Sequence, residues 1–474
     1  MLERLFKLKQ NKTTVSTEFM AGLATFMTMA YIITVNPIII ASGGSDELKN
    51  AVFLATVISA GIGTLLMAFL ANKPFALAPG MGLNTYFAGT VALIASTAAL
   101  SYDEAFQGGL AIILFSGILF TILTLFKIRE KIVEAIPAAI RHGITAGIGL
   151  MLVYIGLGSN AGIYDSNGVP HTMIGFFSAG AKSTSAALGD DYARMMLYVA
   201  TFFIGFFAIV ILNHHKVKGS ILYGILIASV VYFAGQAIFL GESPFASLAG
   251  KEVKDWMPPF DDLVDKTFFK FNFSTLFKLG GFTTIVTVIS FCMVDMFDTI
   301  GTLIGTAAKA NMLEKDGKME NMNQAMLSDS IATCVGACTG TSTVTTFIES
   351  AAGVEEGGRT GLTSVVTGLL FLACMFIAPI AGLIPAPATS AALVFVGVLM
   401  ISALKDIDYN DFAAAAPVTL MLIFMVIGSS IGNGIGIGLI SYSIIKIFSG
   451  KAKDVTFLTI ILAVIFALKF FVIV

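Results

Sequence analysis

Apolar stretches of about 20 residues recur along this whole chain, separated by polar or charged segments. A helix of that length crosses a hydrocarbon layer about 30 Å thick, and in that layer only helices and closed barrels satisfy every backbone N–H and C=O. Hydrophobic residues make up 56% of the 474 residues and charged residues only 12%, about half the charged share of a soluble protein. The sequence therefore predicts an all-α, multi-pass membrane protein.

The charge balance and the cysteines exclude several classes of site. A net charge of −2 and an isoelectric point near 6.1, with Lys and Arg spread through the loops, argue against a nucleic-acid-binding protein. The polar start lacks a small-residue cleavage site, so we expect the first apolar stretch to stay as a membrane span. The four cysteines lie in or beside apolar runs and lack the partners of a metal set. We expect neither a metal nor a cofactor.

Seven spans are predicted in each half of the chain, on either side of a long polar stretch at 241–283. The first seven lie near 19–40, 51–71, 76–96, 107–126, 133–156, 193–212 and 219–240. The second seven lie near 284–308, 322–340, 343–356, 361–381, 385–402, 411–429 and 432–448. The last apolar run, 455–473, fits either an extra span or a helix lying along the membrane surface.

Basic residues predict the orientation of these spans. Arg4, Lys7, Lys9 and Lys12 precede the first span, and further basic loops occur at 127–131, 214–218, 309–318 and 405. With fourteen spans, all of these segments fall on the side of the amino terminus. Because cytoplasmic loops carry the excess of Lys and Arg, we expect a protein of the cytoplasmic membrane with its amino terminus inside the cell.

The two halves also resemble each other in sequence. The fifth span opens with AIPAAIRHGITAGIGLML, and its counterpart in the second half opens with LIPAPATSAALVFVGVLM. Seven is an odd number, so the second half must enter the membrane upside down relative to the first. Inverted repeats of this kind place a binding site near the middle of the bilayer, where the repeats meet.

The third segment of each half is too broken to be a plain helix. These segments are PFALAPGMGLNTYFAGT in the first half and TGTSTVTTFIESAAGVEEGGRTG in the second. Proline removes a backbone donor and glycine permits unusual backbone angles, so an unwound chain can present free N–H and C=O groups to a solute. The β-branched run at 341–346 suits a short strand, which residues 76–78 could pair with.

Two acids lie inside apolar runs: Asp295 in the eighth span and Glu349 in the tenth. A carboxylate at that depth costs about 3 kcal/mol or more unless it is protonated or bound, so both acids indicate a transport or proton site. Asp298 shares a helix face with Asp295, and we favour a structural bond for it. Gly82 could instead let helices approach closely, and Asn84 could instead bond one helix to another.

The motifs resemble a known family at this point. FALAPGMGLNTYF, FCMVDMFDTIGTLIG and TSTVTTFIESAAGVEEGGRTGLTS are similar to segments of the AzgA-type purine permeases, a branch of the nucleobase:cation symporter-2 (nucleobase-ascorbate transporter) family. The tenth segment follows the wider family signature at Glu349, Gly353, Arg359 and Gly361. It departs at Ala351, where the ascorbate branch often has a polar or acidic side chain. That departure favours the AzgA branch.

The resemblance implies seven plus seven inverted spans divided into two domains. A core domain would combine residues 1–130 with 246–383, and a gate domain would combine 131–245 with 384–474. The core would move against the gate like an elevator, and short strands in the third and tenth segments would hold the solute. Relatives of this type are often homodimers, but the sequence leaves the oligomeric state open.

The resemblance also implies a solute and its ligands. The solute would be a purine nucleobase, namely hypoxanthine, guanine or adenine, imported together with a proton rather than sodium. A carboxylate can accept ring N–H groups, an amide can serve a ring acceptor, and an aromatic side chain can stack on the ring. The predicted solute ligands are Asp295, Glu349, Asn84, Gly82, Phe291, Thr343, Phe347 and Ser350, and the predicted proton-coupling groups are Glu349, Asp295 and Asp298.

Three other functions fit less of the sequence. An anion transporter of the same fold would use basic groups and helix dipoles, and two acids in its cavity would repel the solute. A membrane enzyme would need a nucleophile with its base, a metal set or a cofactor motif, and the chain contains no HExxH, GxSxG or P-loop. A channel would need a filter-like repeat around a pore. We therefore predict a transporter and no enzyme.

Overall fold

The structure is a computed structural model of the chain. It describes residues 2–126, 137–158, 161–163, 192–217, 219–243, 257–309, 312, 319–377, 384–427 and 431–471. Several expected features fall outside these ranges, namely the basic loop at 127–131, most of the outer loop at 157–192 and part of the loop at 241–283.

The first half is helical apart from one short strand. Its elements are α1 (Leu2–Phe6), α2 (Val15–Met29), α3 (Ile32–Ile40), α4 (Asp46–Leu66, continued by a π-turn at Met67–Ala71), β1 (Leu77–Pro79), α5 (Met81–Ala98), α6 (Tyr102–Leu125), α8 (Ala138–Gly156), α11 (Tyr192–His214) and α12 (Ser220–Gly235, continued by a π-turn at Gln236–Leu240). Ser45 and Ser101 begin α4 and α6 by accepting first-turn N–H groups.

The second half repeats this order after two short connecting helices. Its elements are α13 (Phe260–Lys266), α14 (Ser274–Leu279), α15 (Gly281–Lys309), α16 (Met322–Thr339), β2 (Val344–Thr346), α17 (Ser350–Glu355), α18 (Gly361–Ala373), α20 (Ala386–Ile401), α21 (Phe412–Ile427), α22 (Ile431–Phe448) and α23 (Phe457–Phe471). Among the described residues, eight helical stretches are long and apolar enough to cross a membrane, and four shorter helices are also apolar. The predicted fold class is confirmed.

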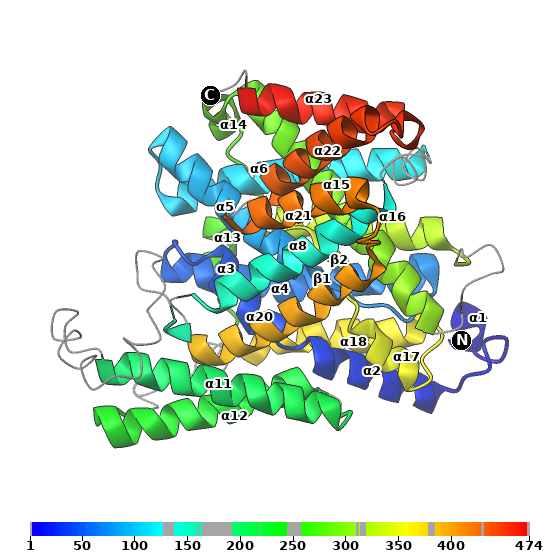
Figure 1. The fold of residues 1–474 in the computed structure, drawn as a ribbon. Coiled ribbons are helices and arrows are strands. Elements are labelled where there is room, and N and C mark those ends of the chain that lie inside the picture. The colour runs from blue at the N-terminus through cyan, green and yellow to red at the C-terminus, as the bar shows by residue number, and fades with distance from the viewer. Residues whose placement is uncertain are drawn as a thin grey trace.

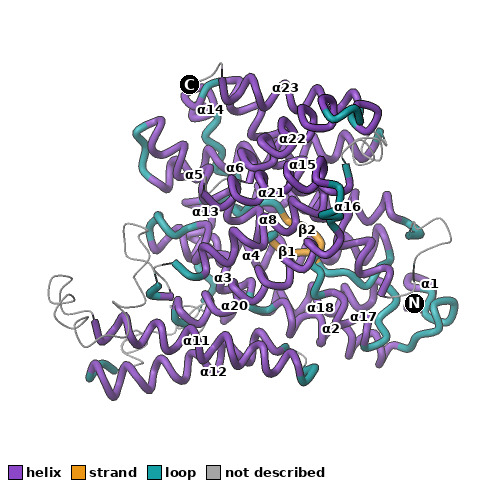
Figure 2. Tube along the Cα trace, in the orientation of Figure 1, coloured by secondary structure: helices purple, strands orange, loops and turns teal. Residues whose placement is uncertain are grey.

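The two strands lie in the middle of the molecule, surrounded by helices (Figure 2). They pair antiparallel, with Leu77 opposite Thr346 and Pro79 opposite Val344. The pairing continues at both ends, because Phe347 N–H donates to Ala76 O (3.0 Å) and Gly80 N–H donates to Thr343 O (3.1 Å). The predicted pairing of the third and tenth segments is therefore confirmed.

Helices of the two halves pack against one another (Figure 1). One set surrounds the strands: α4 contacts α16 and α18, α6 contacts α16, and α2 contacts α17 and α18. In a second set, α8 contacts α20 and α21, and α11 contacts α12 and α20. Gly149 and Gly397 make the α8–α20 crossing close, since a Cβ on either would lie 2.6 Å from the other's carbonyl oxygen.

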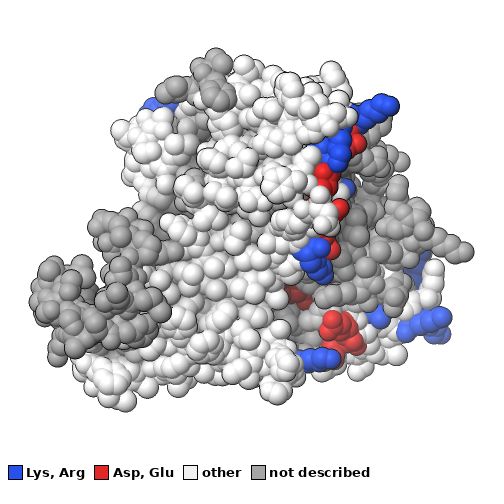
Figure 3. Space-filling view, viewed as in Figure 1, with Lys and Arg blue, Asp and Glu red and all other residues white. Residues whose placement is uncertain are grey.

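The outer surface is apolar across the width of the molecule. Phe207, Val230 and Phe448 expose 54%, 68% and 86% of their surface, as lipid-facing side chains do. Most of the charged side chains in view gather along one edge, the edge where the amino terminus lies (Figures 1 and 3). The last apolar run forms α23, which lies lengthwise beside α22 and also contacts α15.

Candidate functional site

The candidate site lies where the two short strands give way to helices. Pro79 ends β1, and α5 begins at Met81 because the intervening Gly80 has an extended backbone (φ −70°, ψ 123°). Gly80 caps α5 and passes close to β2, because a Cβ on it would lie 2.6 Å from the Thr345 methyl group. Glu349 caps α17 after β2. The amino ends of α5 and α17 therefore flank the strand pair.

Glu349 is held by the break in the first span, between α2 and α3. Tyr31 Oη donates to Glu349 Oε1 at 2.8 Å, and Thr28 Oγ1 donates to the Glu349 main-chain oxygen at 3.4 Å. Glu349 is nevertheless partly exposed. The main-chain N–H of Glu349 also bonds this carboxylate, and among the described residues no other side chain donates to it, so it retains acceptor capacity at Oε2.

Asp298 lies beside Glu349 and is also partly exposed. It projects from α15, near enough to Glu349 for the two charges to interact. Its Oδ2 is 3.8 Å from where a Cβ on Gly80 would lie, which places the carboxylate at the amino end of α5. The site thus combines two accessible carboxylates with the start of a helix, whose free N–H groups carry partial positive charge.

Asp295 lies elsewhere. It is fully buried, its Oδ2 accepts from Thr333 Oγ1 at 2.8 Å, and its charge interacts with Asp329 as well as with Asp298. Among the residues that the structure describes, its Oδ1 has no hydrogen-bond partner. The prediction paired Asp295 with Glu349 across one cavity, whereas the structure brings Asp298 to Glu349. Asp295 and Asp298 are three residues apart on α15, and Asp298 points toward the strand ends while Asp295 faces α16.

Asp329 is a buried acid near the strands that was not among the predicted site residues. It is fully buried on α16 and accepts from Thr299 Oγ1 (2.6 Å) and Thr346 Oγ1 (3.0 Å). Thr299 also bonds the Thr345 hydroxyl at 2.8 Å. Asp329 therefore ties β2 to α15 and α16. The criterion that selected Asp295, an acid inside an apolar span, would have found it within the predicted span 322–340.

Asn84 and Gly82 make the contacts expected of packing residues: Asn84 bonds neighbouring segments together, and Gly82 lets two helices approach. The buried Asn84 amide donates to Pro79 O at 3.4 Å, and its oxygen accepts from the Ser342 hydroxyl. These bonds tie α5 to the segment that leads into β2. A Cβ on Gly82 would collide with the Cγ2 of Ile148, so Gly82 lets α5 lie against α8.

The remaining predicted ligands are all buried. Phe291 stacks on Tyr86 with ring centroids 4.2 Å apart. Thr343 is fully buried and its hydroxyl has no partner within the described ranges, while Phe347 is 6% exposed. Ser350 Oγ accepts from Ala76 N–H at 3.0 Å, which closes the end of the strand pair.

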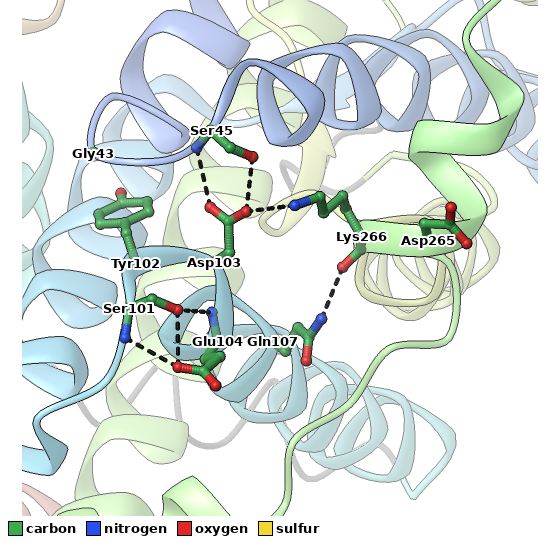
Figure 4. A pocket seen from close by; sticks show the side chains of 9 residues that line it. All are labelled: Gly43, Ser45, Ser101, Tyr102, Asp103, Glu104, Gln107, Asp265 and Lys266. Atoms are coloured by element: carbon green, nitrogen blue, oxygen red, sulfur yellow. Dashed lines mark hydrogen bonds and ion pairs between the residues drawn. The ribbon is translucent and has the colours of Figure 1, made fainter.

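A cavity of about 660 Å³ lies away from the strands, between α6, α13 and the loop before α4 (Figure 4). Its central Asp103 accepts from the N–H and hydroxyl of Ser45 (3.1 and 2.7 Å) and from Lys266 Nζ (3.0 Å). The hydrogen bond to Asp103 raises the pKa of Lys266. These groups are already paired, so the cluster fastens α13 to α6 and leaves little for a ligand.

A family model described as a permease family matches residues 16–437. The chain is 42% identical to "Putative permease MJ0326" of Methanocaldococcus jannaschii, over 99% of this chain and 98% of the relative. It is 36% identical both to "Adenine permease AdeQ" of Escherichia coli (99% and 96% covered) and to "Guanine/hypoxanthine permease PbuO" of Bacillus subtilis (99% and 100% covered).

Solved structures share the fold at low sequence identity. The transmembrane domain of the cyanobacterial bicarbonate transporter BicA matches with a TM-score of 0.62 and 14% identity, covering 89% of this chain and 97% of that domain. SLC26A9 matches with a TM-score of 0.60 and 11% identity, covering 92% and 66%. The arrangement of helices and broken segments is therefore common to these proteins.

Proposed function

The chain belongs to the permease family whose model covers residues 16–437, and on that premise we propose that it imports purine nucleobases across the cytoplasmic membrane. Membership makes it a membrane transporter. The class of solute is supported by relatives of full length whose names specify adenine or guanine and hypoxanthine. Which of the three purines it prefers depends on groups at the edge of the ring.

The observation that carries this proposal is the pair of partly exposed carboxylates, Asp298 and Glu349, at the ends of the strands. A purine is flat and neutral, and its edge combines N–H donors with ring-nitrogen or carbonyl acceptors. Two carboxylates can accept N–H groups, and the first N–H groups of α5 can serve an acceptor on the ring. Hydrogen bonds to charged groups are the stronger kind, which suits a site that must extract its solute from water.

We propose proton symport on the basis of the same pair. Two interacting carboxylates repel each other, and either a proton or a bound N–H donor relieves that repulsion. Asp295 lies one helical turn from Asp298, and its buried Oδ1 has no hydrogen-bond partner among the described residues, which makes it a second place for a proton. We propose Glu349, Asp298 and Asp295 as the proton carriers, with the carboxylates of Asp298 and Glu349 as the solute ligands.

We propose an elevator movement for the transport step. The core would contain residues 1–130 and 246–383, and the gate 131–245 and 384–474. Where they meet, the Ile148 side chain of α8 packs against Gly82 of α5, which adds no side chain of its own. A smooth contact of this kind suits two bodies that slide past each other. The amino terminus would lie in the cytoplasm, and pairing of two chains through the gate is compatible with the apolar surface of α11 and α12.

An anion carrier is the rival suggested by the bicarbonate transporter of similar fold. Two exposed carboxylates in the site disfavour an anion, because like charges repel strongly where water is scarce. We therefore place this chain with the purine carriers.

Uptake of labelled solutes tests the proposal directly. Cells that lack their own purine permeases would express the chain and be offered adenine, guanine, hypoxanthine, uracil or bicarbonate. We expect uptake of at least one purine, loss of that uptake with a protonophore, and no change when sodium is replaced. Bicarbonate uptake without purine uptake would overturn the solute, and purine uptake that needs sodium but survives the protonophore would overturn the coupling.

A further inference from the structure

Tyr31 is a buried tyrosine whose hydroxyl points at the candidate site. Only 1% of its surface is exposed, and it lies in the break between α2 and α3. Its hydroxyl donates to Glu349 Oε1 at 2.8 Å. No acid marks this position, and a tyrosine in an apolar run does not by itself indicate a binding site. The contact joins the first span to the tenth, 318 residues apart.

The position of Tyr31 is itself well fixed. Its main-chain oxygen accepts from Val35 N–H at 3.0 Å, so the residue is anchored to the start of α3. On the preceding turn, Thr28 bonds the main chain of Glu349 at 3.4 Å. The break in the first span therefore holds both the backbone and the carboxylate of Glu349.

A carboxylate held at one oxygen presents the other in a defined direction. Glu349 is partly exposed, and Oε1 is occupied by the tyrosine hydroxyl. Without that donor the side chain could rotate among several rotamers, and a solute would have to select one of them. Preorganisation of this kind acts on affinity, because it removes an ordering cost that binding would otherwise carry.

We propose that Tyr31 is a positioning residue for solute recognition: its hydroxyl holds Glu349 Oε1, so that Oε2 alone accepts the N–H group of the ring. The proposal rests on the proposed function and adds a residue to its site. Tyr31 itself does not touch the solute. Its loss should therefore weaken binding and leave the rate of the loaded transporter nearly unchanged.

The test compares Tyr31→Phe with the unaltered protein in equilibrium binding and in uptake. Purified protein in lipid nanodiscs would be titrated with labelled adenine, guanine and hypoxanthine, and initial rates would be measured in cells. Ordering a freely rotating side chain on binding costs up to about 1.4 kcal/mol, which is a factor of roughly ten in affinity. We expect Kd and KM to rise about tenfold in Tyr31→Phe while the maximal rate per transporter changes less than about twofold.

Tyr102→Phe is the matched control. Tyr102 also donates its hydroxyl, to Ile40 O at 2.9 Å, but it lines the cavity of Figure 4 and lies away from Glu349. This control should leave Kd unchanged. Tyr31→Leu removes the ring together with the hydroxyl, so it should raise Kd at least as much. It provides a second measurement of the effect if Tyr31→Phe folds poorly.

The outcomes separate this inference from the function on which it rests. If the unaltered protein binds none of the purines, the proposed solute is wrong. If it binds one of them and Tyr31→Phe binds it as tightly as Tyr102→Phe does, the positioning role is wrong. A fall in maximal rate with unchanged Kd would likewise refute the role, because it would make Tyr31 part of the movement instead.

Discussion

Two acidic regions lie beside β2, and they differ in what their carboxylates contact. Asp298 and Glu349 are partly exposed, and Tyr31 provides the one side-chain hydrogen bond that the structure describes to either carboxylate. Asp329 is fully buried and accepts two threonine hydroxyls, one from α15 and one from β2. The first region leaves carboxylate oxygens open among the described residues, whereas the carboxylate of Asp329 holds the strand. Depth in the membrane alone therefore does not identify a binding acid.

The comparison predicts separate effects of mutations in the two regions. Substitutions of Asp298 or Glu349 should alter binding and transport while the protein stays folded. Changes around Asp329 should alter stability while the affinity of the folded fraction stays the same. Each variant is thus measured twice, by uptake or binding and by thermal melting of the purified protein.

Glu349→Gln should have the largest effect. It keeps the size of the side chain but removes the charge and replaces one acceptor oxygen with a donor, which would face the N–H groups of the ring. The loss of a charged bond together with the new donor–donor conflict should reduce uptake about 100-fold or more. The amount of protein in the membrane should stay near that of the unaltered chain. Uptake within a few-fold of normal would remove Glu349 from the site.

Asp298→Asn should come next and decides which acid of α15 faces the solute. Asparagine keeps one acceptor and loses the charge, so we expect KM to rise about tenfold. The partner measurement is Asp295→Asn, which changes a buried carboxyl bonded to Thr333 and should raise KM less. If Asp295→Asn weakens solute binding more than Asp298→Asn does, Asp295 and not Asp298 binds the solute together with Glu349.

The sequence was sufficient for the fold because the fold depends on patterns that repeat. Runs of about 20 apolar residues located the spans, and the proline, glycine and β-branched residues of the third and tenth segments located the strands and their pairing. Apolar runs respond to the membrane, and proline, glycine and β-branched residues act on their own backbone. Both can therefore be recognised in the sequence without knowing which residues pack together in the fold. The structure moved the ends of the spans by only a few residues.

The site was less predictable because it depends on directions around a helix. Asp295 and Asp298 lie on the same span three residues apart, and only the packing of α15 against α16 decides which one meets Glu349. Tyr31 lies far from Glu349 in the sequence, and a tyrosine in an apolar run carries no signal of its own. Asp329, by contrast, could have been found, since it breaks an apolar span as plainly as Asp295 does.

Asp329→Ala should be the largest change in the buried region. It removes the acceptor of the Thr299 and Thr346 hydroxyls and leaves a small cavity, so we expect a loss of about 3 kcal/mol in stability. Purified protein should melt at a lower temperature, and less of it should reach the membrane. The folded fraction should bind the solute with normal Kd. A tenfold change in Kd at normal melting temperature would place Asp329 in the binding machinery.

Thr299→Val should give the smallest effect and is the most selective test of the contacts around Asp329. Valine has nearly the shape of threonine, so the packing of α15 stays while Asp329 loses one of its two hydroxyl donors. Thr346 still bonds the other oxygen of the carboxylate, and the expected loss is about 1 kcal/mol. Because Thr299 also bonds Thr345, the change removes one tie between β2 and α15. The two changes share the Thr299–Asp329 bond, so the double variant should lose less stability than the sum of the two single variants. Full additivity in melting experiments would mean that the two residues hold the strand independently.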